Sequence, residues 1–219
     1  KRMNKLGTTA VEIKSGYGLN AEAEVKMLRA IEIVREKFVG RIDVIATFCG
    51  AHAIPKGKTY EEQTIDVIES QIPAVKKAMD NGEIKPKFID VFCEKGYFTT
   101  EETDRILKAG KQYGLIPKVH VNQFNAIEGI ETSVKNNALS VDHLEVLTDD
   151  DVAVLKDSET MPVALPSCSF FLGIPYTDGR KILENNLPLA LATDYNPGST
   201  PSGNMNFVIS TACIKMKMT

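Results

Sequence analysis

Three histidines and one aspartate stand at similar places in the sequence. His52, His120 and His143 each lie at or just beyond the end of a short apolar run, and the chain has no other histidine. Asp194 closes the apolar stretch LPLALATD and is followed by the turn-forming residues YNPG. Neutral imidazole and carboxylate groups suit a divalent ion such as zinc or iron. If the four runs are neighbouring strands, the sequence predicts a metal-dependent site at their ends.

Each of these residues also has a structural interpretation. A single histidine beside apolar sequence is usually a hydrogen-bonded core residue, and Asp194 could cap the following turn with Asn196 and Ser199. The joint placement favours a function, because burying a carboxylate at a strand end is costly unless it is paired or binds a metal. His120 and Asp194 supply only two ligands, whereas a catalytic zinc site uses three protein ligands and one open position. The remaining ligands would have to come from elsewhere.

Four further residues near expected strand ends are weaker candidates. Lys14 and Tyr17 both lie in KSGYG, at the end of the first expected strand, and Tyr17 could donate a hydrogen bond to a ligand or pack in the core. Gln123 follows His120 by three residues, and its amide can both donate and accept, which suits a ring with N–H and C=O groups. Glu94 could bind a second metal or form a structural ion pair, and we favour the structural role.

Seven short runs, mostly apolar at nearly every position, predict strands buried on both faces, as in a parallel sheet. They cover residues 8–14, 42–48, 87–94, 116–121, 138–144, 161–166 and 187–194. Helical patterns lie between them, at residues 20–38, 59–82, 99–114, 126–137 and 148–159. This alternation is typical of a parallel α/β fold. No repeat or linker interrupts it, so we expect one domain over residues 1–219.

Three details of the helices can be tested directly. We expect Asn20 to cap the first helix, Pro73 to break the second, and Thr99 to begin a capping box. The apolar face of the first helix should comprise Met27, Ala30, Ile31, Val34 and Phe38.

A (β/α)8 barrel explains the placement of the polar residues best, because its active site lies at the C-terminal ends of its strands. Such a barrel needs eight strands, and we expect the first one to precede Lys1, since both ends of the chain look cut. An open doubly wound sheet is the alternative. It usually has a G-x-G-x-x-G turn after its first strand, but here Gly16 and Gly18 are followed by Ala21 instead of a third glycine.

The composition is that of an ordinary globular protein. The net charge is -3, with 43% apolar and 25% charged residues, and no long basic run points to nucleic acid. No stretch has the roughly 18 apolar residues of a membrane span, and no secretory signal is visible. The four cysteines lie far apart without a C-x-x-C pair. This pattern favours free thiols in a reducing compartment, and hence a cytoplasmic location, over a disulfide framework or a zinc ribbon.

Several motifs together resemble those of the imidazolonepropionases, the histidine-degrading enzymes of the amidohydrolase superfamily. They are VEIKSGYGL, GAHAIP, FCEKGYF, KVHVNQFN, ALSVDHLE, SCSFFLG and ALATDYNPGS, in this order over essentially the whole chain. The T-D-x-N-P-G motif occurs in related amidohydrolases too, whereas the ordered set is quite specific. The resemblance implies a metal-dependent (β/α)8 barrel, incomplete here, with about seven of its eight strands.

The resemblance also implies residue roles. His120 and Asp194 would bind one divalent metal, zinc or iron, and His143 and Asp194 would be catalytic. The substrate-binding residues would be Tyr17, His52, Gln123, Asn196, Gly198 and Ser199. The implied reaction hydrolyses the small molecule 4-imidazolone-5-propanoate to N-formimidoyl-L-glutamate. We expect no nucleic-acid or membrane partner, and a homodimer is compatible with the sequence.

This chain departs from the family pattern in two respects. The family has a His-x-His pair on its first barrel strand and a nearby arginine for the substrate carboxylate, and this sequence contains no H-x-H. A missing first strand would explain both the absent pair and the strand count, so we expect the 219 residues alone to be inactive. Some relatives carry glutamate at the position of Gln123, and an amide cannot act as a base.

In the implied mechanism, Asp194 accepts a proton from the attacking water and passes it to the leaving ring nitrogen, while His143 polarises the carbonyl. Two alternatives remain at this point: another amidohydrolase, such as a deaminase or cyclic-amide hydrolase, and a non-catalytic binding protein on the same barrel.

Overall fold

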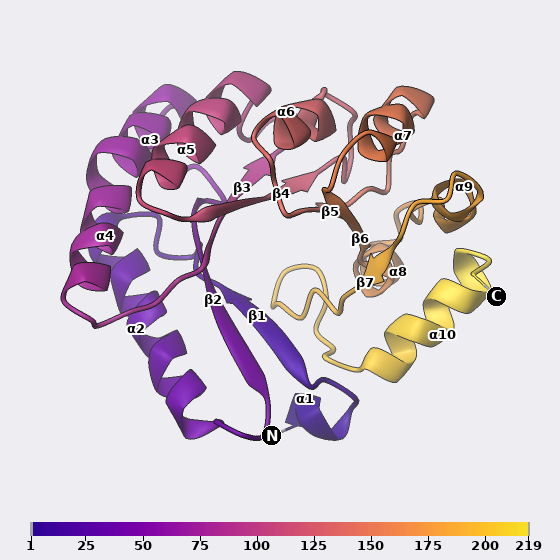
Figure 1. Cartoon of the computed structure of the whole chain (residues 1–219), viewed down its shortest axis with the longest axis horizontal. Coiled ribbons are helices and arrows are strands. Elements are labelled where there is room, and N and C mark those ends of the chain that lie inside the picture. Colours follow the sequence, from indigo (N-terminus) through magenta and orange to yellow (C-terminus); the bar gives the residue numbers. More distant parts are fainter. Residues whose placement is uncertain (1, 219) are drawn as a thin grey trace.

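The computed structural model describes residues 2–218, in which seven parallel strands form one sheet in sequence order. The strands are β1 (Ala10–Lys14), β2 (Asp43–Ala51), β3 (Phe88–Cys93), β4 (Ile116–Val121), β5 (Ser140–His143), β6 (Met161–Ala164) and β7 (Ala190–Leu191). The sheet curls, and the helices α2 to α7 lie along its outside (Figure 1). The expected strand–helix alternation is confirmed, and sequential pairing with outer helices is the topology of a (β/α)8 barrel. An open doubly wound sheet, in which the strand order reverses, is excluded.

The helices of the described residues include the five predicted ones and several that the sequence did not predict. They are α1 (Arg2–Lys5), α2 (Ala21–Lys37), α3 (Tyr60–Asp66), α4 (Ile72–Asp80), α5 (Thr100–Gln112), α6 (Gly129–Lys135), α7 (Asp149–Lys156), α8 (Pro166–Leu172), α9 (Gly179–Glu184) and α10 (Met205–Lys215). A π-helical segment, η1 (Val67–Gln71), joins α3 to α4. Among these helices, none is long and apolar enough to cross a membrane.

The helix starts follow the predicted capping chemistry. The side chain of Asn20 accepts a hydrogen bond from the backbone N–H of Ala23, and Thr99 forms a capping box with Glu102. The α-helix is interrupted just before Pro73, as predicted, but the chain remains helical through the interruption. The helix continues because the π turn η1 shifts the hydrogen-bond register just before the proline, which lies in the first turn of α4.

The predicted apolar face of α2 is wrong in most positions. Of the five predicted residues only Ile31 is buried, and it packs with Val25 and Leu28. Glu24 and Glu32 are buried on the same side. The carboxylate of Glu24 accepts hydrogen bonds from three backbone N–H groups of the preceding loop, described below.

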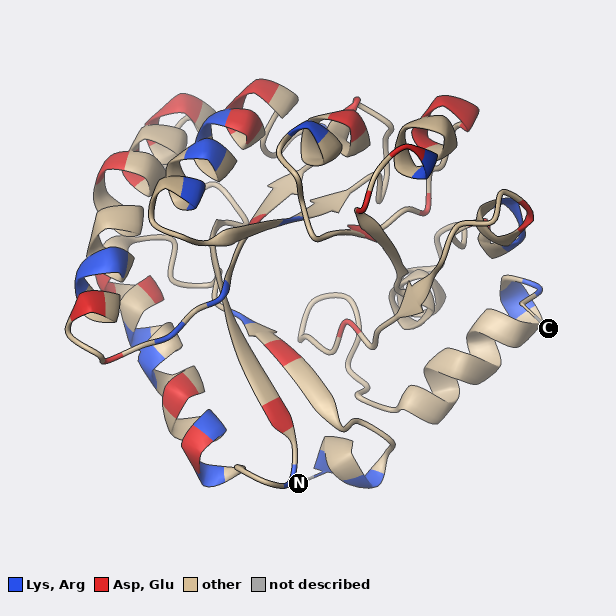
Figure 2. Cartoon of the chain, in the orientation of Figure 1, with Lys and Arg blue, Asp and Glu red and all other residues tan. Residues whose placement is uncertain are grey.

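The strands are not uniformly apolar, because their two faces differ. On β3 and β4, residues such as Ile89, Val91 and Val119 belong to the apolar core that packs under the helices. The alternate residues Asp90 and Lys118 pair side by side in the sheet register. Figure 2 shows that charged residues lie on the strands as well as on the outer helices. The face turned away from the helices is therefore a polar interior, and it can hold the site.

Candidate active site

The three histidines lie together at the C-terminal ends of neighbouring strands. His52 directly follows β2, His120 is the fifth residue of β4, and His143 is the last residue of β5. The ring centroids are 6.4 Å apart for His52 and His120, and 5.4 Å apart for His120 and His143. The Tyr17 ring lies 5.3 Å from that of His52, although this side chain is 57% exposed. The structure thus brings four of the predicted site residues into one row.

His120 is held by a buried carboxylate. Its Nδ1 lies 2.8 Å from Oδ1 of Asp90, a side chain with no exposed surface that also pairs with Lys14. Burial opposes the charge of Asp90, but His120 and Lys14 outweigh it and keep the pKa of this carboxyl far below its ordinary value. Because Asp90 engages Nδ1, the ring presents Nε2 as its free ligand atom, which is the usual arrangement for a metal-binding histidine.

A charged network lies next to this pair in the polar interior. Lys14 Nζ contacts Glu12 at 2.9 Å and Asp142 at 3.3 Å, in addition to Asp90. Burial lowers the pKa of Lys14, but the three carboxylates together raise it well above the ordinary 10.5. The role of Lys14 is therefore to neutralise buried acids.

His143 has a strained backbone. Its φ angle is 93° and that of Leu144 is 66°, both in the left-handed region that non-glycine residues avoid. Thr177 donates a hydrogen bond from Oγ1 to the backbone carbonyl of His143 at 2.8 Å, and the carboxylate of Glu145 lies 3.5 Å from Nδ1. Burial disfavours charge on this ring, but Cys168 and Glu145 outweigh it and raise the pKa of His143 to about 10. This environment favours the protonated ring, which is a hydrogen-bond donor.

His52 has the opposite electrostatic character. Its Nδ1 lies 3.1 Å from the carbonyl oxygen of Gly16, which orients the ring. Burial, followed by repulsion from His120, lowers the pKa of His52 below 6.5. His52 is accordingly neutral at pH 7, so it can meet a polar ring through a hydrogen bond without adding charge.

Asp194 lies in a turn beyond the last strand. The predicted strand over residues 187–194 is wrong in extent, since β7 contains only Ala190–Leu191. Asp194 itself has a φ of 50°, and one of its carboxylate oxygens accepts a hydrogen bond from Ser199 Oγ at 2.9 Å.

The loop after Asp194 is held by its own hydrogen bonds. The Asn196 side chain donates to the backbone carbonyl of Asp194 at 2.8 Å and accepts from the N–H groups of Gly198 at 2.8 Å and Ser199 at 2.7 Å. The capping role that the sequence left open for Asp194, Asn196 and Ser199 is therefore present. This turn fixes the carboxylate; whether the loop also binds a substrate stays a prediction.

The remaining candidates have clear local partners. Glu94 accepts hydrogen bonds from the backbone N–H of Lys95 and of Phe124, both at 2.9 Å, and from the side chain of Asn125 at 3.0 Å. The role of Glu94 is thus structural, as we favoured, but these contacts are hydrogen bonds and not the expected ion pair. Gln123 is buried, and its Nε2 lies 3.5 Å from the sulfur of Cys168.

The G-x-G segment binds an anion that belongs to the chain itself. The N–H groups of Gly16, Gly18 and Leu19 donate to the carboxylate of Glu24 at 2.8–2.9 Å. A phosphate would need these same donors. The weak nucleotide-binding interpretation of this segment therefore has no support.

Sequence reasoning missed three residues that contact the predicted histidines and their neighbours, namely Asp90, Glu145 and Cys168. The signal available for Asp90 was a single acid inside the apolar run FIDVFC, because a charge in such a run must find a buried partner. Glu145 follows His143 by two residues and could have been noticed for the same reason. Nothing in the sequence connects Cys168 to this site.

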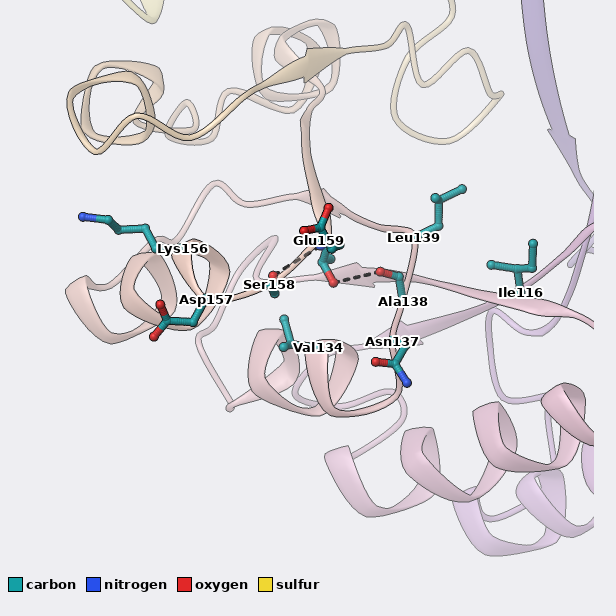
Figure 3. Close-up of a pocket in the computed structure, with 10 residues that line it drawn as sticks. Ile116, Val134, Asn137, Ala138, Leu139, Lys156, Asp157, Ser158 and Glu159 are labelled. Carbon is teal, nitrogen blue, oxygen red and sulfur yellow. Dashed lines mark hydrogen bonds between the residues drawn. The ribbon is translucent and has the colours of Figure 1, made fainter.

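A surface pocket lies away from these residues. Ile116 and Leu139, at the start of β4 and before β5, line it together with Lys156 and Glu159 (Figure 3). These positions are at the N-terminal ends of the strands. In (β/α)8 barrels this end contributes to stability, whereas the active site lies at the C-terminal ends. None of the candidate residues lines this pocket, so the histidine row is the better candidate.

Comparison with known proteins agrees with the geometry. No protein-family model matches the chain. The chain is 59% identical over 221 residues to an imidazolonepropionase of Christiangramia forsetii, with 100% of this chain and 52% of that protein covered. It is 40% identical over 216 residues to a probable imidazolonepropionase of Bos taurus, covering 99% of this chain and 50% of the relative. The chain thus spans about half the length of the curated relatives it matches.

Solved structures show the same fold at low sequence identity. A guanine deaminase from C. acetobutylicum with bound guanine superposes with a TM-score of 0.72 and 16% identity, covering 98% of this chain and 52% of that one. A variant of an atrazine chlorohydrolase from Arthrobacter aurescens, complexed with zinc, superposes with a TM-score of 0.69 and 12% identity, covering 97% and 52%. Over its whole length, the chain is therefore related to the imidazolonepropionases, and its seven strands form part of a (β/α)8 barrel of the same fold as these solved structures.

Proposed function

We propose that this chain is part of an enzyme that hydrolyses the cyclic amide C–N bond of 4-imidazolone-5-propanoate and forms N-formimidoyl-L-glutamate in histidine degradation. The row formed by His52, His120 and His143 at the C-terminal strand ends carries this proposal. The likeness to imidazolonepropionases over the full chain supports the choice of substrate. A single catalytic barrel domain over residues 1–219 is part of the proposal, because one continuous sheet joins all seven strands. The homodimer and the cytoplasmic location stay predictions.

The donor set fits a divalent metal, zinc or iron, which His120 and Asp194 would hold. Asp90 already engages Nδ1 of His120 and leaves Nε2 for a ligand bond. Ser199 engages only one carboxylate oxygen of Asp194, so the other oxygen is available. When bound, such an ion lowers the pKa of a water molecule and polarises a carbonyl group. Zinc bound to a protein of the same fold, the atrazine chlorohydrolase, supports this part of the proposal.

The protein residues divide the proton transfers between them. Asp194 takes a proton from the attacking water as the water oxygen bonds to the ring carbonyl carbon. Asp194 then passes that proton to the ring nitrogen as the C–N bond breaks. The His143 imidazolium donates a hydrogen bond to the oxyanion that develops on the carbonyl oxygen. The raised pKa of His143 suits this role, because it favours the protonated ring.

Other residues would orient the substrate. Neutral His52 and the exposed hydroxyl of Tyr17 lie on one side of His120 and would contact the imidazolone ring. Gln123 would accept from or donate to the ring through its amide. Asn196, Gly198 and Ser199 would reach the substrate or product from the loop after Asp194, and some of their mutual hydrogen bonds would then have to be exchanged.

The test uses the natural gene product that contains this chain. With zinc supplied, it should convert imidazolonepropanoate to N-formimidoyl-L-glutamate, identified by mass spectrometry, and should not deaminate guanine. Asp194→Asn should abolish turnover because the amide cannot carry the proton. Asp150→Asn, at an exposed position of α7, is the matched control and should keep the wild-type rate. Full activity of Asp194→Asn would contradict the residue assignment, and guanine deamination without formimidoylglutamate would contradict the proposed substrate.

A further inference from the structure

A second group of metal-ligating side chains lies beside the proposed active site. His143 ends β5, Glu145 follows it in the next loop, and Cys168 lies in the first turn of α8. One potential ligand atom from each residue lies within 4.8 Å of the other two. The exposed fractions of the three residues are 3%, 6% and 0%. Neither His120 nor Asp194 belongs to this group.

Two polar atoms of this group have no partner within the described residues. They are Nδ1 of His143 and Oε2 of Glu145. The distance of 3.5 Å between His143 Nδ1 and Glu145 Oε1 is too long for a good hydrogen bond. A buried carboxylate oxygen without a donor is costly, and a cation at this position would satisfy it.

The surroundings of the group hold it in place. Ser169 donates a hydrogen bond from Oγ to Oε1 of Glu145 at 3.1 Å, which orients the carboxylate and leaves Oε2 free. Gln123 points its Nε2 at the sulfur of Cys168 at 3.5 Å. Hydrogen bonds of this kind orient metal ligands and are found around many protein metal sites.

The chemistry of the three donors selects the class of ion. Imidazole, carboxylate and thiolate together suit zinc and the similar ion cobalt(II), because a soft sulfur ligand is poorly matched to calcium or magnesium. Three protein ligands leave the fourth tetrahedral position for water. Binding would release two protons into solvent, one from the Cys168 thiol and one from the protonated His143 ring, since the ligands are a thiolate and a neutral imidazole.

We propose that His143, Glu145 and Cys168 form a second site for zinc or a similar divalent transition-metal ion, adjacent to the site of His120 and Asp194. The existence of this site is independent of the proposed function. Its consequence rests on that function: an ion held by His143 removes this ring from the reaction. Zinc in excess of the first equivalent should therefore inhibit turnover.

Cobalt titration of the metal-free gene product tests the second site directly. A cobalt–thiolate bond gives a charge-transfer absorption band, and the proposed first site contains no sulfur. We expect two equivalents to bind, with the band developing only with the second. Cys168→Ser should lose the band and the second equivalent, whereas Cys213→Ser, at an exposed cysteine, should keep both. Saturation of the wild type at one equivalent, or a band that persists in Cys168→Ser, would overturn the proposal.

A second variant and an activity measurement complete the test. Glu145→Gln keeps the shape of the side chain and removes an anionic ligand, so the affinity for the second equivalent should fall about tenfold or more; an unchanged affinity would exclude Glu145 as a ligand. For each protein, the turnover rate with excess zinc is compared with the rate of the same protein at one equivalent. Excess zinc should slow the wild type and Cys213→Ser, and it should not slow Cys168→Ser. Absence of turnover at one equivalent would count against the proposed function alone, because the cobalt band does not depend on it.

Discussion

Two imidazole–carboxylate pairs lie on neighbouring strands of the same barrel wall, and they differ in tightness. In the first, His120 and Asp90 are 2.8 Å apart, and the carboxylate also pairs with Lys14. In the second, His143 Nδ1 and Glu145 Oε1 are 3.5 Å apart, and within residues 2–218 neither His143 Nδ1 nor Glu145 Oε2 has a hydrogen-bond partner. In the first pair both carboxylate oxygens have partners, whereas in the second the carboxylate is available for further partners.

The backbone explains this difference. Asp90 and His120 lie within regular strands. Phe92 pairs with His120 in the sheet register, and Asp90 lies two residues before Phe92 on the same face of its strand, so the side chains of Asp90 and His120 meet at fixed positions. His143 instead ends its strand at a φ of 93°, and Glu145 reaches it through an irregular loop. A metal ligand benefits from a fixed orientation, while a group that moves protons or captures an ion needs polar atoms that are not already hydrogen-bonded. The contrast suggests how one wall can serve both purposes.

Lys14→Met should have the largest effect on stability, because Lys14 is the cation that pairs with Asp90 beside His120. Removing this cation leaves Asp90, Asp142 and Glu12 with too little positive charge in a buried environment. We expect a loss of about 3–5 kcal/mol in the free energy of unfolding, measured by urea denaturation. Lys26→Met, at an exposed position of α2, is the control and should change it by less than about 0.5 kcal/mol. Equal effects would show that the network is not stabilising.

Acid should weaken the same network in wild-type protein. The pKa of Asp142 is lowered because Lys14 and Lys118 outweigh its burial, and that of Asp90 is lowered as well. For a carboxyl with a depressed pKa, the stabilisation is present above its ordinary value of 3.8 and is lost as the pH falls through the folded-state value. The free energy of unfolding should therefore fall below about pH 4. In Lys14→Met this fall should be shallower, and an identical pH profile would contradict the assignment.

Asp90→Asn should have an intermediate effect on stability. The amide retains the shape of the side chain, but its hydrogen bond to His120 is no longer charge-assisted. Hydrogen bonds to charged groups contribute about 1.5–3 kcal/mol to the free energy of unfolding. Glu145→Gln should lower the free energy of unfolding by about 1 kcal/mol or less, because its contact with His143 is already long. Thermal or urea unfolding of both variants measures the difference, and a larger loss in Glu145→Gln would reverse the comparison.

The smallest effect concerns a thiol near the tight pair, and it changes reactivity without changing stability. Burial raises the pKa of Cys93, on the same strand as Asp90, to about 11. Because the thiol stays protonated in the folded state, iodoacetamide should label Cys93 slowly between pH 8 and pH 10. Exposed Cys213 is the internal reference and should react faster than Cys93 over this range. Comparable labelling rates, determined by peptide mass spectrometry, would show that this wall opens readily.

The sequence predicts the elements better than it predicts the contacts between them. The apolar runs place His52, His120 and His143 at strand ends, and parallel pairing then brings them together. The partners Asp90 and Glu145 depend on register and on a strained turn, neither of which has a local signature. The buried face of α2 was also missed, and Glu24 on that face binds the preceding loop instead of facing solvent. Helix α10 was missed because its sequence is apolar on most sides and shows no clear periodicity.

The affinity of the first metal site tests the central contrast most directly. Zinc binding to the metal-free gene product can be measured by competition with a chromogenic chelator for the wild type, Asp90→Asn and Glu145→Gln. If Asp90 fixes His120 as a ligand, Asp90→Asn should weaken the first equivalent by about 10–100-fold, while Glu145→Gln leaves it unchanged. Equal affinities for the wild type and Asp90→Asn, or a loss confined to Glu145→Gln, would contradict the account.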